Sequence, residues 1–189
     1  WFYNFNDIVI IPYLGLRSEL VKSGLNCRSE VAHLGVDIKR FSPSVNKKES
    51  KKKILIPSHK SVIGYCGRIS REKNVLILLE GFKKLRHQED LVLLIVGDGD
   101  PELMTELRKQ DNCICTGFVD DVEKYLQAMD IFVMPSLTET TSLATLEAMS
   151  CGLPVVSSKV GFIAEYLEKG FNGGFFPREN PTMLAIKIE

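Results

Sequence analysis

The amino-acid sequence predicts an α/β protein whose main body is a doubly wound parallel sheet. From Ser61 onward, short apolar runs alternate with longer segments in which apolar residues recur at helical spacing. This alternation repeats every ~20–30 residues, which is typical of βαβ units. The composition agrees: 44% apolar and 25% charged residues are ordinary for a globular protein and exclude an intrinsically disordered or fibrous chain.

The apolar runs are expected to form strands that are buried on both faces. These strands are expected at residues 61–65, 91–96, 113–116, 131–134, 154–157 and 173–176. Helices are expected between them at residues 74–87, 101–110, 122–128, 142–150 and 162–169, the first with an apolar stripe at Leu76, Leu79, Phe82 and Leu85. Ligands of such sheets bind beyond the carboxyl ends of the strands, so the strand-to-helix loops are the first places to search for a site.

The residues before Ser61 form a different region. A strand at residues 7–11, a helix at 16–23 and a strand at 30–33 make a unit too small to bury its own faces. We therefore expect residues 1–42 to be the tail of a preceding domain, residues 43–60 a Lys-rich linker, and residues 61–189 the main domain. The chain opens on Trp1 and closes on a helical pattern without a cap signal, so we expect a main domain truncated at its C-terminus.

The net charge is zero, but it is unevenly distributed. Residues 1–60 carry eleven Lys and Arg against five Asp and Glu, and much of the excess is Lys47, Lys48, Lys51, Lys52 and Lys53. A solvated, mobile linker is the interpretation that we favour, because no aromatic residues interleave with these lysines. A surface for nucleic acid or an anionic membrane is the alternative.

The cysteine and histidine residues give no sign of a metal site. The five cysteines are odd in number and contain no C-x-x-C pair, and the three histidines are scattered. This favours free thiols in a reducing compartment over a disulfide scaffold or a zinc centre. The longest apolar stretches, residues 8–11 and 91–96, are far shorter than the ~18 residues of a membrane-spanning helix, so none is expected.

Two of the strand-to-helix loops, residues 67–74 and 97–102, lead to different predictions: a phosphate-binding loop and a structural turn. In residues 67–74, Gly67, Arg68 and Lys73 lie at the mouth of a strand and the start of a helix, where the two cations could close on a phosphate. An exposed charged loop is the alternative there. Residues 97–102 contain two glycines but also Glu102 in place of the last glycine of a dinucleotide fingerprint, so we interpret them as a structural turn.

The loop at residues 135–149 combines an anion site with hydroxyl acceptors. Thr and Ser residues open its helix, where backbone N–H groups near Thr141, Ser142 and Leu143 could hold an anion. Glu139 in the loop and Glu147 on the helix can accept hydrogen bonds from hydroxyl groups. A ligand that is both an anion and a polyol is a sugar nucleotide. The alternative is that Glu139 and Glu147 are solvated surface charges without a ligand.

Several stretches together resemble one known family. They are residues 63–68 with Lys73, residues 117–119, Pro135-Ser136 with Glu139, and residues 147–156. They are similar to the donor-binding, C-terminal domain of family 4 retaining glycosyltransferases, which have the two-domain GT-B fold with Rossmann-like halves. Residues 7–12, 35–37 and 41–43 resemble the end of the acceptor domain and the interdomain linker.

The resemblance implies a role for each site residue. Arg68 and Lys73 would neutralise the donor diphosphate as the glycosidic bond breaks, without a metal. Glu139 would contact the donor sugar and Glu147 the ribose. Thr141, Ser142 and Leu143 would offer backbone N–H groups to the phosphates, Gly67 would belong to the same site, and Val119 would lie beside the base. The chain departs from the family where Thr140-Thr141-Ser142 replaces a Gly-Phe-Gly-like run.

The resemblance therefore implies an enzyme that moves a sugar from a nucleotide diphosphate sugar, its donor substrate, to an acceptor, with no cofactor. A sugar, lipid or glycan acceptor would be held by the largely missing N-terminal domain, so this chain alone would be inactive. A GT-B-fold sugar-nucleotide epimerase, a phosphorylase or a non-catalytic nucleotide-sugar-binding domain is the alternative. We expect a cytoplasmic protein without nucleic-acid partners, and peripheral contact with the inner face of the membrane is the alternative.

Overall fold

A computed structural model describes residues 2–189 of the chain, so Trp1, the first residue of the expected tail, lies outside the described residues. The main body is a six-stranded, fully parallel sheet with the order β5-β4-β3-β6-β7-β8. Its strands are β3 (Ser61–Cys66), β4 (Leu91–Val96), β5 (Cys113–Cys115), β6 (Ile131–Met134), β7 (Val155–Ser158) and β8 (Gly173–Phe176). All six agree with the predicted strands to within one or two residues at each end. The fold class predicted from the sequence is confirmed.

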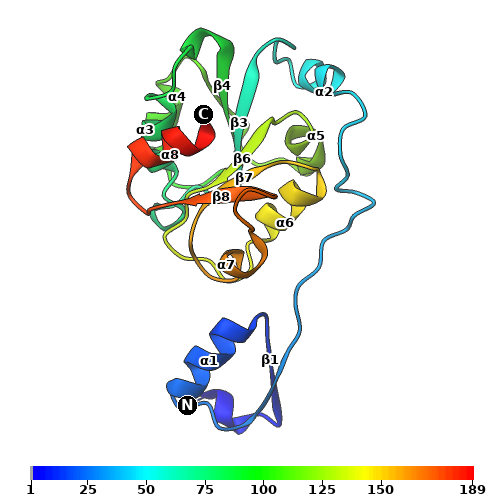
Figure 1. The fold of residues 1–189 in the computed structure, drawn as a ribbon, viewed down its shortest axis with the longest axis vertical. Helices are drawn as coiled ribbons and strands as arrows, with labels where there is room; N and C mark the ends of the chain where they lie inside the picture. The colour runs from blue at the N-terminus through cyan, green and yellow to red at the C-terminus, as the bar shows by residue number, and fades with distance from the viewer. Residues whose placement is uncertain (1) are drawn as a thin grey trace.

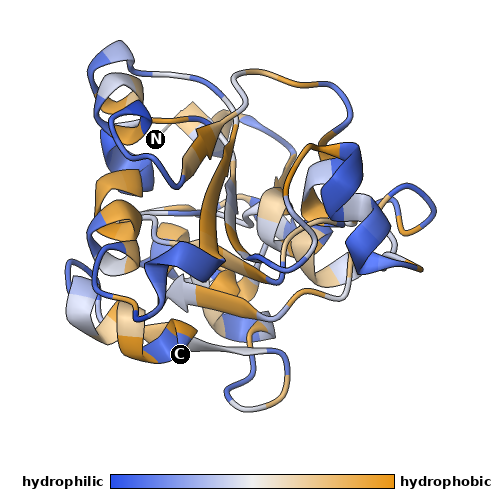
Figure 2. Cartoon of the chain, turned by 90° about the horizontal axis from the view of Figure 1, so that it is seen from above, coloured by the Kyte–Doolittle hydropathy of each residue, from blue (hydrophilic) through white to orange (hydrophobic). Residues whose placement is uncertain are grey.

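Helices cover both faces of this sheet (Figure 1). They are α3 (Val75–Phe82), α4 (Pro101–Arg108), α5 (Val122–Leu126), α6 (Leu143–Ser150), α7 (Ile163–Tyr166) and α8 (Pro181–Ile188), with short 3₁₀ turns at Arg71–Lys73 and Gln88–Asp90. α8 packs against α3, while α5 and α6 lie together on another side of the sheet. Figure 2 shows the hydrophobic central strands enclosed by more hydrophilic outer segments, as burial of apolar surface requires.

Two helices end three or more residues earlier than their sequence patterns predict. α3 stops at Phe82 because the Gln88 side chain donates to the carbonyl oxygens of Phe82 and Leu85, at 2.6 and 2.9 Å, and turns the chain. α7 stops at Tyr166, whose carbonyl accepts from the Asn172 side chain at 3.0 Å. In both cases a side chain outside the periodic segment supplies the partner that the next helical turn would have supplied.

The N-terminal region is a small unit outside the six-stranded sheet. It contains a 3₁₀ turn at Phe2–Phe5, β1 (Ile8–Ile11), α1 (Leu14–Lys22) and β2 (Arg28–Val31), and β1 pairs in parallel with β2. The Phe162 ring, which precedes α7, stacks between Tyr13 and His33 at centroid distances of 5.6 and 4.7 Å. The predicted strand-helix-strand arrangement is therefore present and contacts the main body at α7.

The Lys-rich segment differs from the expected linker. Lys47–Lys53 form the helix α2, whose N-cap Asn46 accepts from the Glu49 backbone N–H at 3.3 Å. Lys51 is buried and its ammonium donates to Asp130 at 2.6 Å and to the Lys60 carbonyl at 2.8 Å, while Lys47 donates to the Met129 carbonyl. The expectation of a solvated segment is wrong here, because two of the five lysines find acceptors on the main domain. The boundaries at residues 42 and 60 stay predictions.

We expect Lys51→Ala to lower the free energy of unfolding by about 1–2 kcal/mol, because it removes one partner of a half-buried ion pair. Asp130 keeps 34% of its side chain exposed, which reduces the cost below that of a fully buried pair. Lys52→Ala is the matched control, since Lys52 pairs with Glu49 at the surface and its loss should change stability by less than ~0.5 kcal/mol. Urea unfolding of both variants measures the difference; equal stabilities would contradict this docking of α2.

Within residues 2–189, none of the helices combines the length and the apolar character that crossing a membrane demands.

Candidate functional site

The strand order reverses between β3 and β6, and a doubly wound sheet binds its ligands at this switch point. The loop after β3 holds Gly67, Arg68 and Lys73, and the loop after β6 holds Glu139. β3 pairs directly with β6 through Ile63 and Gly64, so both loops leave the same edge of the sheet. Residues far apart in the sequence are therefore placed together at the predicted position.

The β3–α3 loop is held by backbone contacts with the loop that follows β4. The Gly67 N–H donates to the Val96 carbonyl and the Ile69 N–H donates to the Asp98 carbonyl, each at 2.9 Å. A Cβ atom on Gly97 would lie 2.1 Å from the Gly67 carbonyl oxygen, so only glycine permits this approach. Residues 97–102 thus form the structural turn that the sequence predicts, and they also support the site loop.

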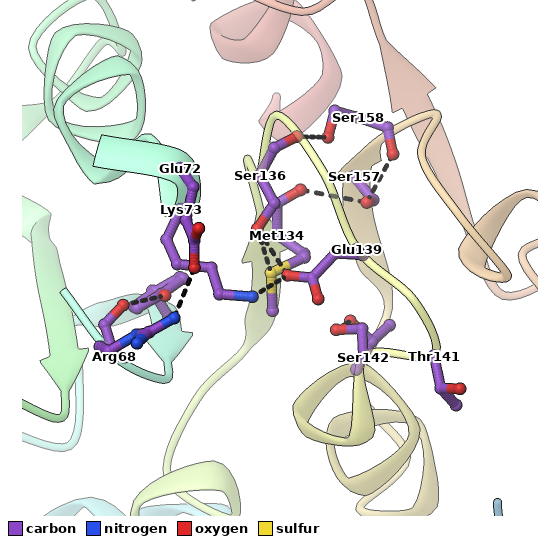
Figure 3. A network of polar contacts seen from close by, with 12 residues as sticks. Arg68, Glu72, Lys73, Met134, Ser136, Glu139, Thr141, Ser142, Ser157 and Ser158 are labelled. Carbon is purple, nitrogen blue, oxygen red and sulfur yellow. Dashed lines mark hydrogen bonds and ion pairs between the residues drawn. The ribbon is translucent and has the colours of Figure 1, made fainter. Parts of the chain in front are cut away.

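The two cations of the β3–α3 loop that were predicted as site residues have different environments. The Arg68 side chain is 68% exposed, and its guanidinium pairs with Glu72 at 2.5 Å. The Lys73 side chain is 20% exposed and its ammonium pairs with Glu139, whose side chain is only 7% exposed, at 2.7 Å. Figure 3 shows Lys73 and Glu139 pointing toward each other across the gap between their loops. This ion pair joins the two loops at the switch point, and it has little access to water.

The Glu139 carboxylate has a second anchor that the sequence analysis did not assign. The hydroxyl of the fully buried Ser136 donates to the same oxygen, Oε1, at 2.7 Å (Figure 3). The Pro135-Ser136 dipeptide was part of the recognised motif, but a buried serine after a strand carries no signal of its contact with Glu139. Only the turn of the loop between the two residues brings them together.

The N-terminus of α6 lies in the same loop and leaves backbone donors without a side-chain cap. Ser142 precedes the helix with φ +56°, a left-handed conformation that is uncommon for a non-glycine residue. Its hydroxyl contacts the Thr145 hydroxyl at 2.8 Å rather than a backbone N–H group. The first-turn N–H groups of Leu143 and its neighbours therefore remain available to an anion. Thr141 is buried and lies apart from the Lys73–Glu139 pair in Figure 3.

A cavity of about 390 Å³ lies beside these loops. It is lined by Cys66, Gly67, Arg68, Val96, Gly97, Asp98, Phe118, Val119 and Val122. Gly67, Arg68 and Val119 were predicted as site residues, whereas Phe118 and Asp98 were not given a role. The Phe118 ring is 79% exposed, and an exposed aromatic ring at the rim of a cavity is a surface on which a flat ring can stack.

Glu147 is half-buried on α6 and is separate from the Lys73–Glu139 pair. Burial raises the pKa of its carboxyl, an effect that nearby Arg40 partly opposes. Its charge also contributes to the raised pKa of Cys66, about 12, for which burial is the larger cause. Cys66 lines the cavity, whereas Glu147 is not among the lining residues.

Glu147→Gln should stabilise the ligand-free protein at neutral pH. A carboxyl whose pKa is raised by folding holds more protons in the folded state, so its contribution to stability falls as the pH rises above its ordinary value of 4.5. The variant should therefore be more stable than the wild type toward pH 7, and this difference in stability should disappear near pH 4. Thermal unfolding between pH 4 and 8 measures it. A difference that is constant with pH would contradict the cause that we assign.

Among residues 2–189, no group of three or more His, Cys, Asp or Glu side chains is arranged to hold a metal ion. The site offers cations, carboxylates and backbone N–H groups instead. These suit a ligand that carries both phosphate and hydroxyl groups.

The strand order and the site at its switch point define a Rossmann-like α/β domain. Residues 60–189 match the family model described as "Glycosyl transferases group 1". The chain therefore belongs to the group 1 glycosyltransferases, and its fold is that of the GT-B enzymes.

Individual relatives agree with this assignment. The UDP-Gal:alpha-D-GlcNAc-diphosphoundecaprenol alpha-1,3-galactosyltransferase of Escherichia coli is 37% identical over 138 residues, which cover 67% of this chain and 35% of that protein. The C-terminal domain of the group 1 glycosyl transferase LpcC from Francisella tularensis is 27% identical with a TM-score of 0.72, covering 82% of this chain and 86% of that domain. HepE from Anabaena in complex with UDP-glucose has a TM-score of 0.87 at 23% identity, covering 97% of this chain and 53% of that one.

The chain spans about a third of the length of the curated relatives that it matches. It corresponds to the C-terminal domain of the GT-B structures, as the sequence resemblance implied.

Proposed function

We propose that this chain binds a uridine diphosphate sugar and forms the donor half of a family 4 retaining glycosyltransferase. The observation that carries the proposal is the Lys73–Glu139 ion pair at the switch point, next to the cavity lined by Gly67, Arg68 and Val119. The uridine nucleotide is suggested by HepE, whose solved structures include complexes with UDP and UDP-glucose. The site residues keep the roles that the sequence resemblance implies.

The proposed chemistry is stabilisation of a leaving diphosphate. Arg68, Lys73 and the N-terminus of α6 near Thr141, Ser142 and Leu143 would meet the negative charge that grows as the bond to the sugar breaks. Glu139 would contact the sugar and Glu147 the ribose hydroxyls. Val119 would meet the base through its main chain beside the Phe118 ring. No metal is needed in this scheme, because fixed cations and dipoles balance the charge.

The acceptor would be a sugar, lipid or glycan held by a further domain across the cleft. Exposed Lys48, Lys52 and Lys53 on α2 are available for contact with an anionic membrane, which stays a prediction. Co-sedimentation with anionic vesicles, compared between the chain and its Lys48→Glu/Lys52→Glu/Lys53→Glu variant, measures that contact. Lys47 and Lys51 are left intact because they hold α2 on the main domain.

The proposed function predicts that this chain binds donor but does not transfer sugar. At a UDP concentration of 100 Kd, binding should stabilise the folded chain by about 2.7 kcal/mol, which a thermal-shift titration detects. Incubation of labelled UDP-sugar with candidate acceptors should yield no glycoside, because the proposed scheme places the groups that position the acceptor in a further domain. No thermal shift with any nucleotide diphosphate would overturn the donor assignment, and efficient transfer would overturn the division between two domains.

Product analysis of a longer protein that includes this chain separates the competing activities. A glycoside with retained anomeric configuration supports the proposal. An epimerised nucleotide sugar, a sugar phosphate or no product would favour the epimerase, the phosphorylase or the non-catalytic binding domain respectively.

A further inference from the structure

Ser136 follows β6 directly and is held on two sides. Its side chain is completely buried, and its carbonyl oxygen accepts from the Ser158 hydroxyl at 2.5 Å. Its own hydroxyl lies 2.7 Å from Glu139 Oε1 and 3.2 Å from the Met134 sulfur. A carboxylate is by far the stronger acceptor of the two, so the hydroxyl proton belongs to the bond with Glu139.

The two oxygens of the Glu139 carboxylate have unequal surroundings. Oε1 accepts from both Ser136 and Lys73, each at 2.7 Å. Within residues 2–189, no hydrogen bond reaches Oε2. The loop backbone packs closely against Gly161, where a Cβ atom would lie 2.0 Å from the Glu139 carbonyl oxygen, and the Phe162 N–H donates to the Thr140 carbonyl at 2.8 Å. One oxygen is therefore committed to the protein and the other is left for a ligand.

We propose that Ser136 is a positioning residue that fixes Glu139 so that Oε2 faces the donor sugar. The inference rests on the proposed function, because it takes the sugar as the partner of Glu139. Lys73 alone would be an unreliable anchor, since a bound diphosphate competes for its ammonium. The Ser136 hydroxyl is buried and neutral, so phosphate cannot draw it away, and it keeps Glu139 in place while Lys73 shifts toward the phosphates.

The first test compares the affinities of UDP and UDP-glucose for this chain by titration calorimetry. Ser136→Ala should leave UDP affinity within about twofold and reduce the advantage of UDP-glucose over UDP by about tenfold, the loss expected when one hydrogen bond to a charged group goes. Ser157→Ala is the matched control: Ser157 is equally buried on β7, but its hydroxyl donates to backbone carbonyls and not to Glu139. It should change neither affinity.

Ser136→Cys leaves no cavity and keeps a weak donor at this position, so it controls for a folding defect caused by lost volume in Ser136→Ala. It should give an intermediate loss of the UDP-glucose advantage. If both Ser136 variants retain the full advantage, or weaken UDP and UDP-glucose equally, Ser136 does not position Glu139.

The second test does not depend on the ligand. A crystal structure of Ser136→Ala should show the Glu139 carboxylate rotated or spread over several orientations, with Lys73 as its remaining partner. An unchanged carboxylate would overturn the positioning role whether or not the chain binds a nucleotide sugar. Failure of wild-type protein to bind UDP or any UDP-sugar would instead overturn the proposed function, and with it the identity of the group that Oε2 faces.

Discussion

Lys73→Ala is expected to weaken UDP binding by about ten- to a hundredfold while changing uridine binding by less than about twofold. Lys73 is the less exposed of the two proposed site cations, and a charge-assisted contact with phosphate contributes about 1.5–3 kcal/mol. Uridine lacks the diphosphate, so it should be insensitive to the change. Titration calorimetry with both ligands measures the difference.

Arg68→Ala should have a smaller effect on UDP, of about three- to tenfold. Its side chain is 68% exposed and its guanidinium must leave Glu72 to reach a phosphate, so solvent and the existing pair reduce the gain in binding free energy. Arg71→Ala is the matched control, because Arg71 is an exposed cation in the same loop whose side chain is outside the proposed site. Circular dichroism of each variant checks folding, since Lys73→Ala leaves the Glu139 carboxylate without its cation. Equal losses for UDP and uridine would place these cations away from the diphosphate.

The two glutamates should respond differently to the same substitution. Glu147→Gln should weaken UDP and UDP-glucose alike, by about tenfold, because the ribose is common to both ligands. Glu139→Gln should spare UDP and weaken UDP-glucose, because only the latter carries the sugar. Titration of both ligands into each variant measures the pattern, with Glu80→Gln on the outer side of α3 as the control. Loss of UDP binding in Glu139→Gln together with unchanged UDP binding in Glu147→Gln would show that the assigned contacts with the sugar and the ribose are the wrong way round.

The same pair can be separated by kinetics in a longer protein that includes the acceptor domain. A group that contacts the non-reacting ribose contributes equally to substrate and transition state, so Glu147→Gln should mainly raise KM. Glu139 lies against the proposed reacting sugar, so Glu139→Gln should mainly lower kcat. A change confined to KM in both variants would indicate that neither residue acts in the transition state.

Sequence pattern alone was enough for the strands of the main sheet and for the family. Strands buried on both faces are continuous apolar runs, so β3, β4 and β6 could be located without knowledge of their neighbours. Helix ends were harder to predict. Gln88 and Asn172 terminate α3 and α7 from outside the helical segments, and a local pattern does not contain such contacts.

The burial of Lys51 in the lysine run could not be predicted from local sequence either. A cluster of five lysines is usually solvated, but the burial of Lys51 depends on Asp130, which lies 79 positions later in the chain. Local composition cannot reveal a partner that only folding brings within reach.

The sequence by itself determined the α/β class and the glycosyltransferase family, and it supplied the residues of the proposed nucleotide-sugar site, because these follow from local periodicity and short motifs. The tertiary structure alone decided how those residues meet. The reversal of strand order between β3 and β6 brings Lys73 to Glu139, and the turn after β6 brings the buried Ser136 hydroxyl to the same carboxylate oxygen. The physical reason is that a carboxylate excluded from water needs hydrogen-bond donors or a cation nearby. Which residues supply them depends on which loops the fold places next to each other at the carboxyl ends of the strands.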